Sequence, residues 1–275
     1  MEIKIEIKSI FGGVLFEYSK ENNTVKETVE EAVRCGVSLD GASLNRASLI
    51  GASLDGASLD GASLNRASLD GASLIGASLD GASLNRASLN RASLDGASLD
   101  GASLNRASLD GASLDGASLN RASLYGASLD GASLIGASLY GASLDGASLI
   151  GASLYGASLY GASDIPYIPL NCPSEGSFIG WKKVNDKLIK LLIPEDAKRC
   201  SATSYKCRCD KAQVLAITSL NEKNSFDSVT NENYSPHIEY KVGEMVYPDK
   251  FDEDRWNECS NGIHFFINKQ DAINY

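Results

Sequence analysis

A five-residue repeat occupies the middle of the chain and constrains its fold more than any other feature. From Val37 to Gly161 the sequence reads as 25 consecutive pentapeptides, each with Leu at the third position and Ser before it. A period of five matches neither the 3.6-residue turn of a helix nor the alternation of a strand, and the frequent Gly disfavours a helix. A chain that turns a corner in every pentapeptide would place its Leu and Ala inward, and stacked coils would bury them together.

The repeat resembles that of the pentapeptide-repeat proteins, which centre on Leu or Phe with a small Ala two residues earlier. The resemblance implies a mainly β fold, a right-handed quadrilateral β-helix with four pentapeptides per coil, and therefore about six coils over residues 37–163. One departure is the Ser before every Leu, where the family usually mixes Asp, Asn, Ser and Thr. This uniformity indicates tandem duplication or a consensus design, and the irregular flanking segments favour a natural gene.

Four pentapeptides per coil would place residues 20 apart on one face, so the outward positions can be arranged in columns. The first holds Asp40, Asp60, Asp80, Asp100, Asn120, Tyr140 and Tyr160, and the second Asn45, Asn65, Asn85, Asn105, Tyr125 and Asp145. In this second column an Arg follows each Asn. We expect the stacked Asn amides to form a hydrogen-bonded ladder and the stacked aspartates to repel weakly, by about 1 kcal/mol or less per pair in water.

The segment of residues 1–36 is expected to cap the first coil, since an open end would expose unpaired strand edges. Glu2–Ile10 and Val14–Tyr18 alternate well enough for a hairpin that turns at a Gly-Gly pair. Thr24 and Glu27 form a capping-box pattern at the start of an amphipathic helix.

Residues 164–275 differ in composition from the repeats and contain all six prolines and both tryptophans, which predicts a separate domain. We expect short strands at Ser177–Trp181, Leu188–Ile193, Val214–Ser219, Ile238–Tyr240 and Ile263–Ile267. A helical turn is expected near Gln270–Tyr275. These elements predict a β-rich or α+β domain. The stretches 172–183, 193–215 and 258–266 resemble a domain of unknown function that follows pentapeptide repeats, a family with no assigned chemistry.

The C-terminal domain also holds the weak candidates for a metal or catalytic site, which are Cys200, Cys207, Cys209, Cys259 and His264. Their spacing matches no standard zinc motif, so we expect no metal site, no cofactor and reduced thiols that pack a small core. A catalytic Cys–His pair would draw on Cys259 or Cys209 with His264 or His237. Nothing adjacent activates either thiol, and Glu258 beside Cys259 would raise its pKa. We therefore predict no catalytic residues and no enzyme, with a metal-binding or enzymatic C-terminal domain as an alternative.

A second alternative is an acidic DNA mimic that inhibits a DNA-binding enzyme such as gyrase, the activity best known for the family that the repeat resembles. The repeats carry 11 Asp and 6 Arg, a net charge of −5, over roughly 30 Å of stacked coils. Duplex DNA carries about 18 charges over that length. The charge density of the repeats is therefore low for a mimic.

Outward-facing aromatic residues occur only in the last pentapeptides, where they predict a contact surface. This surface comprises Tyr125, Tyr140, Tyr155, Tyr160, Ile135 and Ile150. Three interpretations stay open: residues 164–275 fold back onto it, it binds a protein partner or a second copy of the chain, or its exposure is incidental.

Composition narrows the remaining classes of function. The chain has 275 residues with a formal charge of −10, which disfavours direct nucleic-acid binding and attachment to a membrane surface. No apolar run approaches the ~18 residues of a membrane span, and the first ten residues do not resemble a signal peptide. We expect a cytoplasmic, non-enzymatic scaffold that binds an unknown protein partner and is a monomer or weak homo-oligomer.

Overall fold

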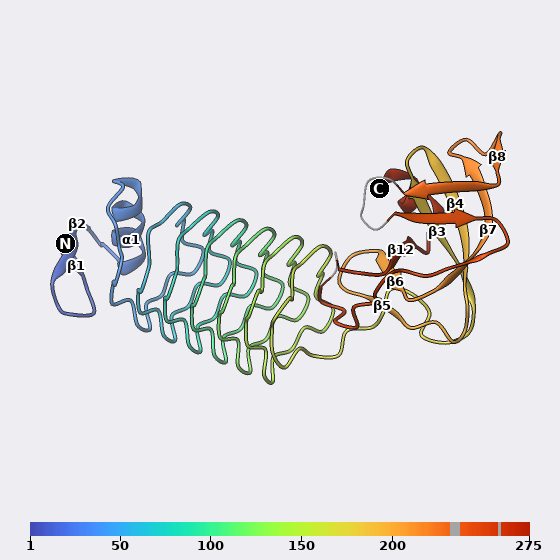
Figure 1. The fold of residues 1–275 in the computed structure, drawn as a ribbon. Coiled ribbons are helices and arrows are strands. Elements are labelled where there is room, and N and C mark those ends of the chain that lie inside the picture. Colours follow the sequence, from blue (N-terminus) through green and yellow to red (C-terminus); the bar gives the residue numbers. More distant parts are fainter. Residues whose placement is uncertain (232–236, 258–259) are drawn as a thin grey trace. The chain divides into compact units, whose positions relative to one another are not determined.

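The computed structural model describes residues 1–231, 237–257 and 260–275. It divides into two compact units, Met1–Tyr167 and Ile168–Tyr275, each with its own core. Both units are built mainly of β-structure (Figure 1).

Coils that repeat every 20 residues form most of the first unit and lie stacked in Figure 1. Parallel bridges join each Ser that precedes Leu to the Ser 20 residues later, from Ser43↔Ser63 to Ser143↔Ser163. At a typical bridge the Leu64 N–H donates to the Ser83 carbonyl at 2.7 Å, and the Ser83 N–H donates to the Ala62 carbonyl at 2.8 Å. The 20-residue register expected from the sequence is therefore the register of the backbone hydrogen bonds.

Each pentapeptide ends in a tight turn, which limits the β-structure of the repeats to isolated bridges rather than long strands. The Ala67 N–H donates to the Leu64 carbonyl at 3.0 Å across the turn. The last residue of each pentapeptide, which is the second of the two central residues of the turn, has φ near +60°, a conformation that favours Gly. Arg occupies this position at Arg46, Arg66, Arg86, Arg91, Arg106 and Arg121, with φ between 58° and 61°. A non-glycine residue in this conformation costs roughly 1–2 kcal/mol.

Leu and Ala side chains fill the interior of the coils. Every repeat Leu from Leu39 to Leu144 is at most 3 % exposed, and so are the alanines between them except the half-buried Ala47. Full burial of one Leu side chain contributes roughly 1.5–3 kcal/mol, so the stacked core dominates the stability of this unit.

A hairpin and a helix precede the coils and bond to the first of them. The strands are β1 (Glu2–Lys8) and β2 (Val14–Glu21), and the helix is α1 (Val25–Arg34). The Ser43 N–H donates to the Lys8 carbonyl at 2.7 Å, which continues the pairing from the hairpin into the coils. The Lys26 ammonium donates to the carbonyls of Ile50 and Gly51, each at 3.0 Å.

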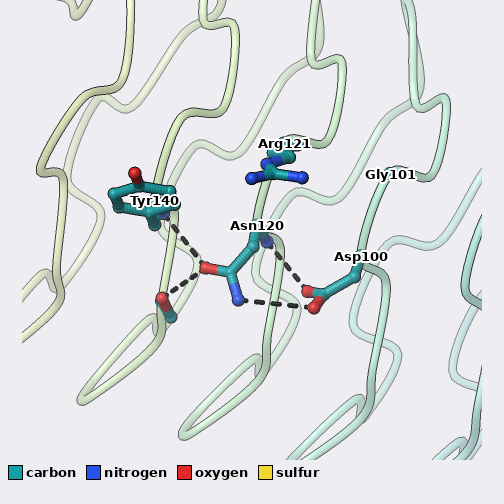
Figure 2. A pocket seen from close by; sticks show the side chains of 6 residues that line it. Asp100, Gly101, Asn120, Arg121 and Tyr140 are labelled. Carbon is teal, nitrogen blue, oxygen red and sulfur yellow. Dashed lines mark hydrogen bonds between the residues drawn. The ribbon is translucent and has the colours of Figure 1, made fainter.

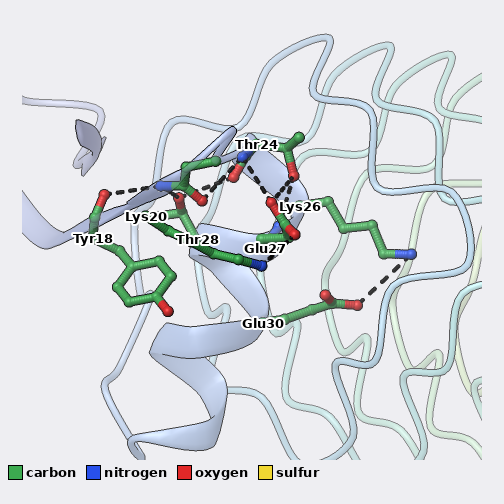
Figure 3. Close-up of polar contacts among 8 residues, drawn as sticks. Tyr18, Lys20, Thr24, Lys26, Glu27, Thr28 and Glu30 are labelled. Carbon is green, nitrogen blue, oxygen red and sulfur yellow. Dashed lines mark hydrogen bonds and ion pairs between the residues drawn. The ribbon is translucent and has the colours of Figure 1, made fainter. Parts of the chain in front are cut away.

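The capping box at the start of α1 is complete (Figure 3). The Glu27 N–H donates to the Thr24 hydroxyl at 3.2 Å, and the Thr24 N–H donates to the Glu27 carboxylate at 3.0 Å. Lys20 forms an ion pair with the same carboxylate at 2.6 Å. The hydrogen bonds from Lys20 and Thr24 lower the pKa of Glu27.

In its described residues, the second unit is a β-domain with one short helix. Its eight-stranded sheet runs β11-β7-β4-β3-β12-β6-β5, with β8 paired to β7, and a separate pair joins β9 to β10. The elements are β3 (Phe178–Val184), β4 (Lys187–Ile193), β5 (Arg199–Ser201), β6 (Lys206–Cys209), β7 (Ala212–Ser219), β8 (Ser225–Phe226), β9 (Ser228–Asn231), β10 (Ile238–Lys241), β11 (Met245–Val246), β12 (Ile263–Phe266) and α2 (Lys269–Asn274). The core includes Ile189, Val214, Tyr240 and Phe265.

Candidate functional site

A side-chain ladder runs along the outside of the coils and gives a structural role to most of the serines that precede Leu. Asn65 is a typical member: its Oδ1 atom accepts the Ser83 hydroxyl at 2.8 Å and the Asn85 N–H at 3.0 Å. Its own amide nitrogen donates to the Ser63 hydroxyl at 2.9 Å. The expected ladder from Asn amide to Asn amide is therefore wrong, since Ser and the backbone supply the partners. All six Asn of the ladder instead tie their own coil to the next.

The aspartates of the repeats make the same two contacts as the asparagines. Ten of them accept both a Ser hydroxyl and a backbone N–H, namely Asp40, Asp55, Asp60, Asp70, Asp80, Asp95, Asp100, Asp110, Asp115 and Asp130. These donors offset part of each carboxylate's charge. The acidic residues therefore have a structural role in the stacked coils of residues 37–163, which we call the rod. The structure does not favour the DNA-mimic alternative.

The fourth residue of each pentapeptide, directly after Leu, is the ladder position that Asp or Asn occupies elsewhere. The exposed tyrosines and isoleucines stand at this position, and they offer no oxygen atom to the Ser 18 residues later. The six residues of the expected contact surface are between 43 % and 76 % exposed. The 20-residue register divides them into two groups on different columns. The first group comprises Tyr125, Tyr140 and Tyr160, on the first two columns, and the second comprises Ile135, Ile150 and Tyr155, on the other two.

The first group, which we call the tyrosine surface (Tyr125, Tyr140 and Tyr160), combines stacked rings with arginines. The rings of Tyr140 and Tyr160 have centroids 5.8 Å apart, and the Arg106 guanidinium lies 5.7 Å from the Tyr125 ring centroid. Tyr and Arg, together with Trp, are enriched at the energetic centres of protein interfaces. The tyrosine surface therefore has the composition of a binding surface.

An open hollow of about 660 Å³ lies where the first column changes from Asp to Tyr (Figure 2). It is lined by Asp100, Gly101, Asn120, Arg121, Ser138 and Tyr140. Asn120 accepts the Ser138 hydroxyl and the Tyr140 N–H, and its amide nitrogen donates to Asp100 at 3.4 Å. These bonds occupy the polar groups of Asn120, so the side chains left to meet a partner are Arg121 and the Tyr140 ring.

The second column carries a row of arginines, which we call the arginine column (Arg46, Arg66, Arg86 and Arg106). All four are exposed, and each follows an Asn of the ladder. Among the residues that the structure describes, none of the four has an acidic partner within ion-pair distance. The sequence predicts this column, but only as a partial offset to the repulsion among the aspartates of the adjacent column.

The sheet of the second unit separates the candidate metal and catalytic residues. Cys209 pairs with Ile263 and Cys207 with Phe265, so both thiols are on the core face of β6. His264 pairs with Arg208 and therefore lies on the opposite face. Cys200 also pairs with Arg208, whose guanidinium donates to the Cys200 sulfur at 3.3 Å.

The remaining candidates form no cluster with these residues. Cys259 lies outside the described residues, and the exposed His237 contacts the Asn231 carbonyl at 3.2 Å. In the described part of the chain, no three His, Cys, Asp or Glu side chains gather as a metal site would require.

The pKa shifts of four candidates do not suit nucleophilic catalysis, namely those of Cys200, Cys207, Cys209 and His264. Burial raises the pKa of Cys200 and Cys209. The pKa of Cys207 is raised mainly by a hydrogen bond with Cys172 and, to a smaller extent, by burial. The same hydrogen bond lowers the pKa of Cys172, which is buried. Burial, with the nearby Lys182, lowers the pKa of His264 to about 3, so its imidazole is neutral and a weak base.

The half-buried Lys182 holds a desolvated charge that was not anticipated from the sequence. The Lys182 ammonium donates to the His264 carbonyl at 3.2 Å and lies 5.9 Å from the Tyr240 ring centroid. Burial lowers the pKa of Lys182 to about 8. Strand alternation could have placed Lys182 on the core face with Gly180 and Val184, but nothing in its local sequence marks it as buried.

Two family models match the chain. Pentapeptide repeats, described as eight copies, match residues 35–66, 67–106, 97–139 and 127–163. A family of unknown function, DUF5758, matches residues 168–272. A comparison with curated proteins finds no match. Among the described residues, neither helix has the length and apolar character needed to cross a membrane.

Solved structures with similarity to the chain are themselves pentapeptide-repeat proteins. The protein Rfr23 from the cyanobacterium Cyanothece 51142 is 35 % identical over 34 % of this chain and 60 % of its own, with a TM-score of 0.31. HetL, involved in heterocyst differentiation regulation in Nostoc sp. strain PCC 7120, is 37 % identical over 44 % of this chain and 69 % of its own, with a TM-score of 0.21.

A third similar structure is QnrB1, a plasmid-mediated fluoroquinolone resistance protein. It is 21 % identical over 44 % of this chain and 68 % of its own, with a TM-score of 0.30. The matches to the two families cover both units of the structure. The chain belongs to the pentapeptide-repeat proteins and carries a DUF5758 domain after its repeats.

Proposed function

We propose that this protein is a non-enzymatic scaffold that binds a protein partner through the tyrosine surface. In this proposal residues 37–163 form a right-handed quadrilateral β-helix of about six coils, which residues 1–36 cap. Residues 164–275 form a separate domain. Four buried free cysteines in that domain support a reducing compartment such as the cytoplasm.

One observation carries the proposal. Tyr125 and Tyr140 stand at ladder positions where Asn or Asp would accept two hydrogen bonds from the next coil, as Asn105 and Asn120 do one coil earlier. Each such bond contributes roughly 0.5–1.5 kcal/mol. The rod therefore gives up stabilising bonds in favour of exposed aromatic rings, which is expected of a surface selected for binding.

The sequence of the repeats provides the controls for a test. The tyrosine surface is altered in the full-length chain by Tyr140→Ser with Tyr160→Ser, and the matched control changes two exposed isoleucines of earlier coils, Ile50→Ser with Ile75→Ser. A photo-crosslinking amino acid at Tyr125 then captures partners from a lysate of the source cells.

We expect one protein to be crosslinked to the wild type and to the isoleucine control, and to be lost in the tyrosine variant. Circular dichroism melts would show that both variants stay folded. Equal capture by all three chains, or no capture by any of them, would contradict the proposal.

A further inference from the structure

The arginine column is the feature of the rod that the proposed scaffold does not use. Arg46, Arg66, Arg86 and Arg106 adopt φ values between 59° and 61°, where most other pentapeptides of the chain have Gly. Arg in this conformation is strained, and strain retained at repeated positions points to a role of the side chain. This inference rests on the interaction role proposed above but concerns the arginines, of which Arg106 also contacts the tyrosine surface through the Tyr125 ring.

The other polar groups beside the column already have partners. The Oδ1 atoms of Asn45, Asn65, Asn85 and Asn105 each accept a Ser hydroxyl and a backbone N–H. The amide nitrogens of Asn65, Asn85 and Asn105 donate to Ser hydroxyls. The guanidinium groups are therefore the donors that this edge of the rod offers to a partner, and donors of this charge bind anionic acceptors.

Nearby acidic residues do not neutralise the column. The neighbouring column carries Asp40, Asp60, Asp80 and Asp100, and each of these carboxylates is bonded to a Ser hydroxyl and a backbone N–H. Charges on other faces are screened over about 8 Å at physiological salt. An anion in direct contact with the guanidinium groups is therefore favoured despite the chain's net charge of −10.

The spacing of the column fits an extended acidic peptide. Adjacent coils are about 4.8 Å apart, so the four arginines span roughly 14 Å. Alternate residues of an extended strand are about 6.7 Å apart, so three acidic residues at alternate positions span roughly 13 Å. We propose that the arginine column binds an extended segment of a partner protein with Asp or Glu at alternate positions.

The repeats supply a variant that removes the charges without harming the fold. Arg46→Gly, Arg66→Gly, Arg86→Gly and Arg106→Gly together install the residue that the positive φ favours. The matched control, Arg91→Gly with Arg121→Gly, changes the same kind of turn on other columns. Neither variant should melt below the wild type.

The probe is a fluorescein-labelled peptide of alternating glutamate and serine, added to the full-length chain and followed by fluorescence anisotropy. We expect binding in about 50 mM NaCl that weakens as salt is added. The four-arginine variant should bind at least about tenfold more weakly, because several charge pairs are lost together. The control should bind as the wild type does, and a peptide of glutamine and serine should not bind.

Other occupants of the column would appear as distinct results. A short oligothymidylate that binds more tightly than the acidic peptide, in a manner that depends on the four arginines, would overturn the proposal in favour of a phosphate backbone. Salt-sensitive dimers that the four-arginine variant abolishes, without peptide binding, would assign the column to a second copy of the chain. The two proposals can fail separately. If the full-length chain does not bind the acidic peptide but still captures a partner through Tyr125, only the inference on the arginine column fails. If it binds the peptide but captures no partner through Tyr125, only the proposal on the tyrosine surface fails.

Discussion

The Asn65 side chain accepts the Ser83 hydroxyl from the next coil at 2.8 Å. The two residues are 18 positions apart, and the same bond recurs along the rod from Asp40 with Ser58 to Asp130 with Ser148. Ser and Asp or Asn are thus one structural unit that is divided between neighbouring coils.

Replacement of Asn65 should separate the role of the oxygen from that of the charge. Asn65→Ala removes the acceptor of two hydrogen bonds, and we expect the free energy of unfolding to fall by about 1–3 kcal/mol. Asn65→Asp should have little effect, because Asp makes both contacts elsewhere in the rod. Urea unfolding followed by circular dichroism measures the difference. Equal stability of the two variants would show that the ladder contributes nothing.

Restoring the ladder at an exposed isoleucine should stabilise the rod. Ile75 is 46 % exposed and occupies a ladder position. Ile75→Asn would offer an acceptor to the Ser93 hydroxyl and the Asp95 N–H, and we expect the free energy of unfolding to rise by about 1 kcal/mol. Ile75→Ala is the control and should give no rise. A drop in melting temperature for the Asn variant would argue against the ladder.

Removing the buried charge of Lys182 should stabilise the second domain. Its pKa is lowered to about 8 from a usual value of 10.5, which corresponds to a cost on the order of 3 kcal/mol for the charged form at neutral pH. Lys182→Met keeps the aliphatic chain, and after loss of the bond to the His264 carbonyl we expect a net gain of about 1–2 kcal/mol. Chemical denaturation at pH 7 tests this. A destabilised variant would mean that the hydrogen bond outweighs the burial of the charge.

His264 should make the second domain sensitive to acid. Its pKa is about 3 in the folded chain and near 6.5 when unfolded. Between these values the unfolded chain binds the proton more readily, so stability falls as the pH falls from about 6.5 towards 3, by roughly 2 kcal/mol at pH 5. His264→Leu should reduce this loss. Urea midpoints at pH 7 and pH 5 for both chains provide the measurement, and parallel losses would contradict the assignment.

The interior of the rod could be predicted from the sequence because the period of five is explicit. Leu and Ala recur at fixed positions, and a coil of four pentapeptides brings them together in a buried stack. The 20-residue register also gave the composition of each column. The register alone did not reveal which atoms form hydrogen bonds. We expected the Asn85 amide to bond to the Asn residues above and below it, but its nitrogen donates to the Ser83 hydroxyl at 2.9 Å.

The second domain was less predictable because its buried residues include polar ones. The strands β5 and β6, which are three and four residues long, were not expected from the sequence. In the structure Arg208 is buried and its guanidinium donates to the carbonyls of Asp252, Asn257 and Asp254. Carbonyl groups more than 40 residues away thus satisfy this charge, and a local sequence pattern carries no sign of them.

The 20-residue register also limits how the length of such a protein can change during evolution. Duplication or loss of four pentapeptides leaves every downstream residue on its original column, because each bridge joins positions 20 apart. Gain or loss of a single pentapeptide moves all later residues to the adjacent column. Arg106, for example, would then no longer stand above Arg86. Gene lineages that keep these columns should therefore differ in length by whole turns of the coil.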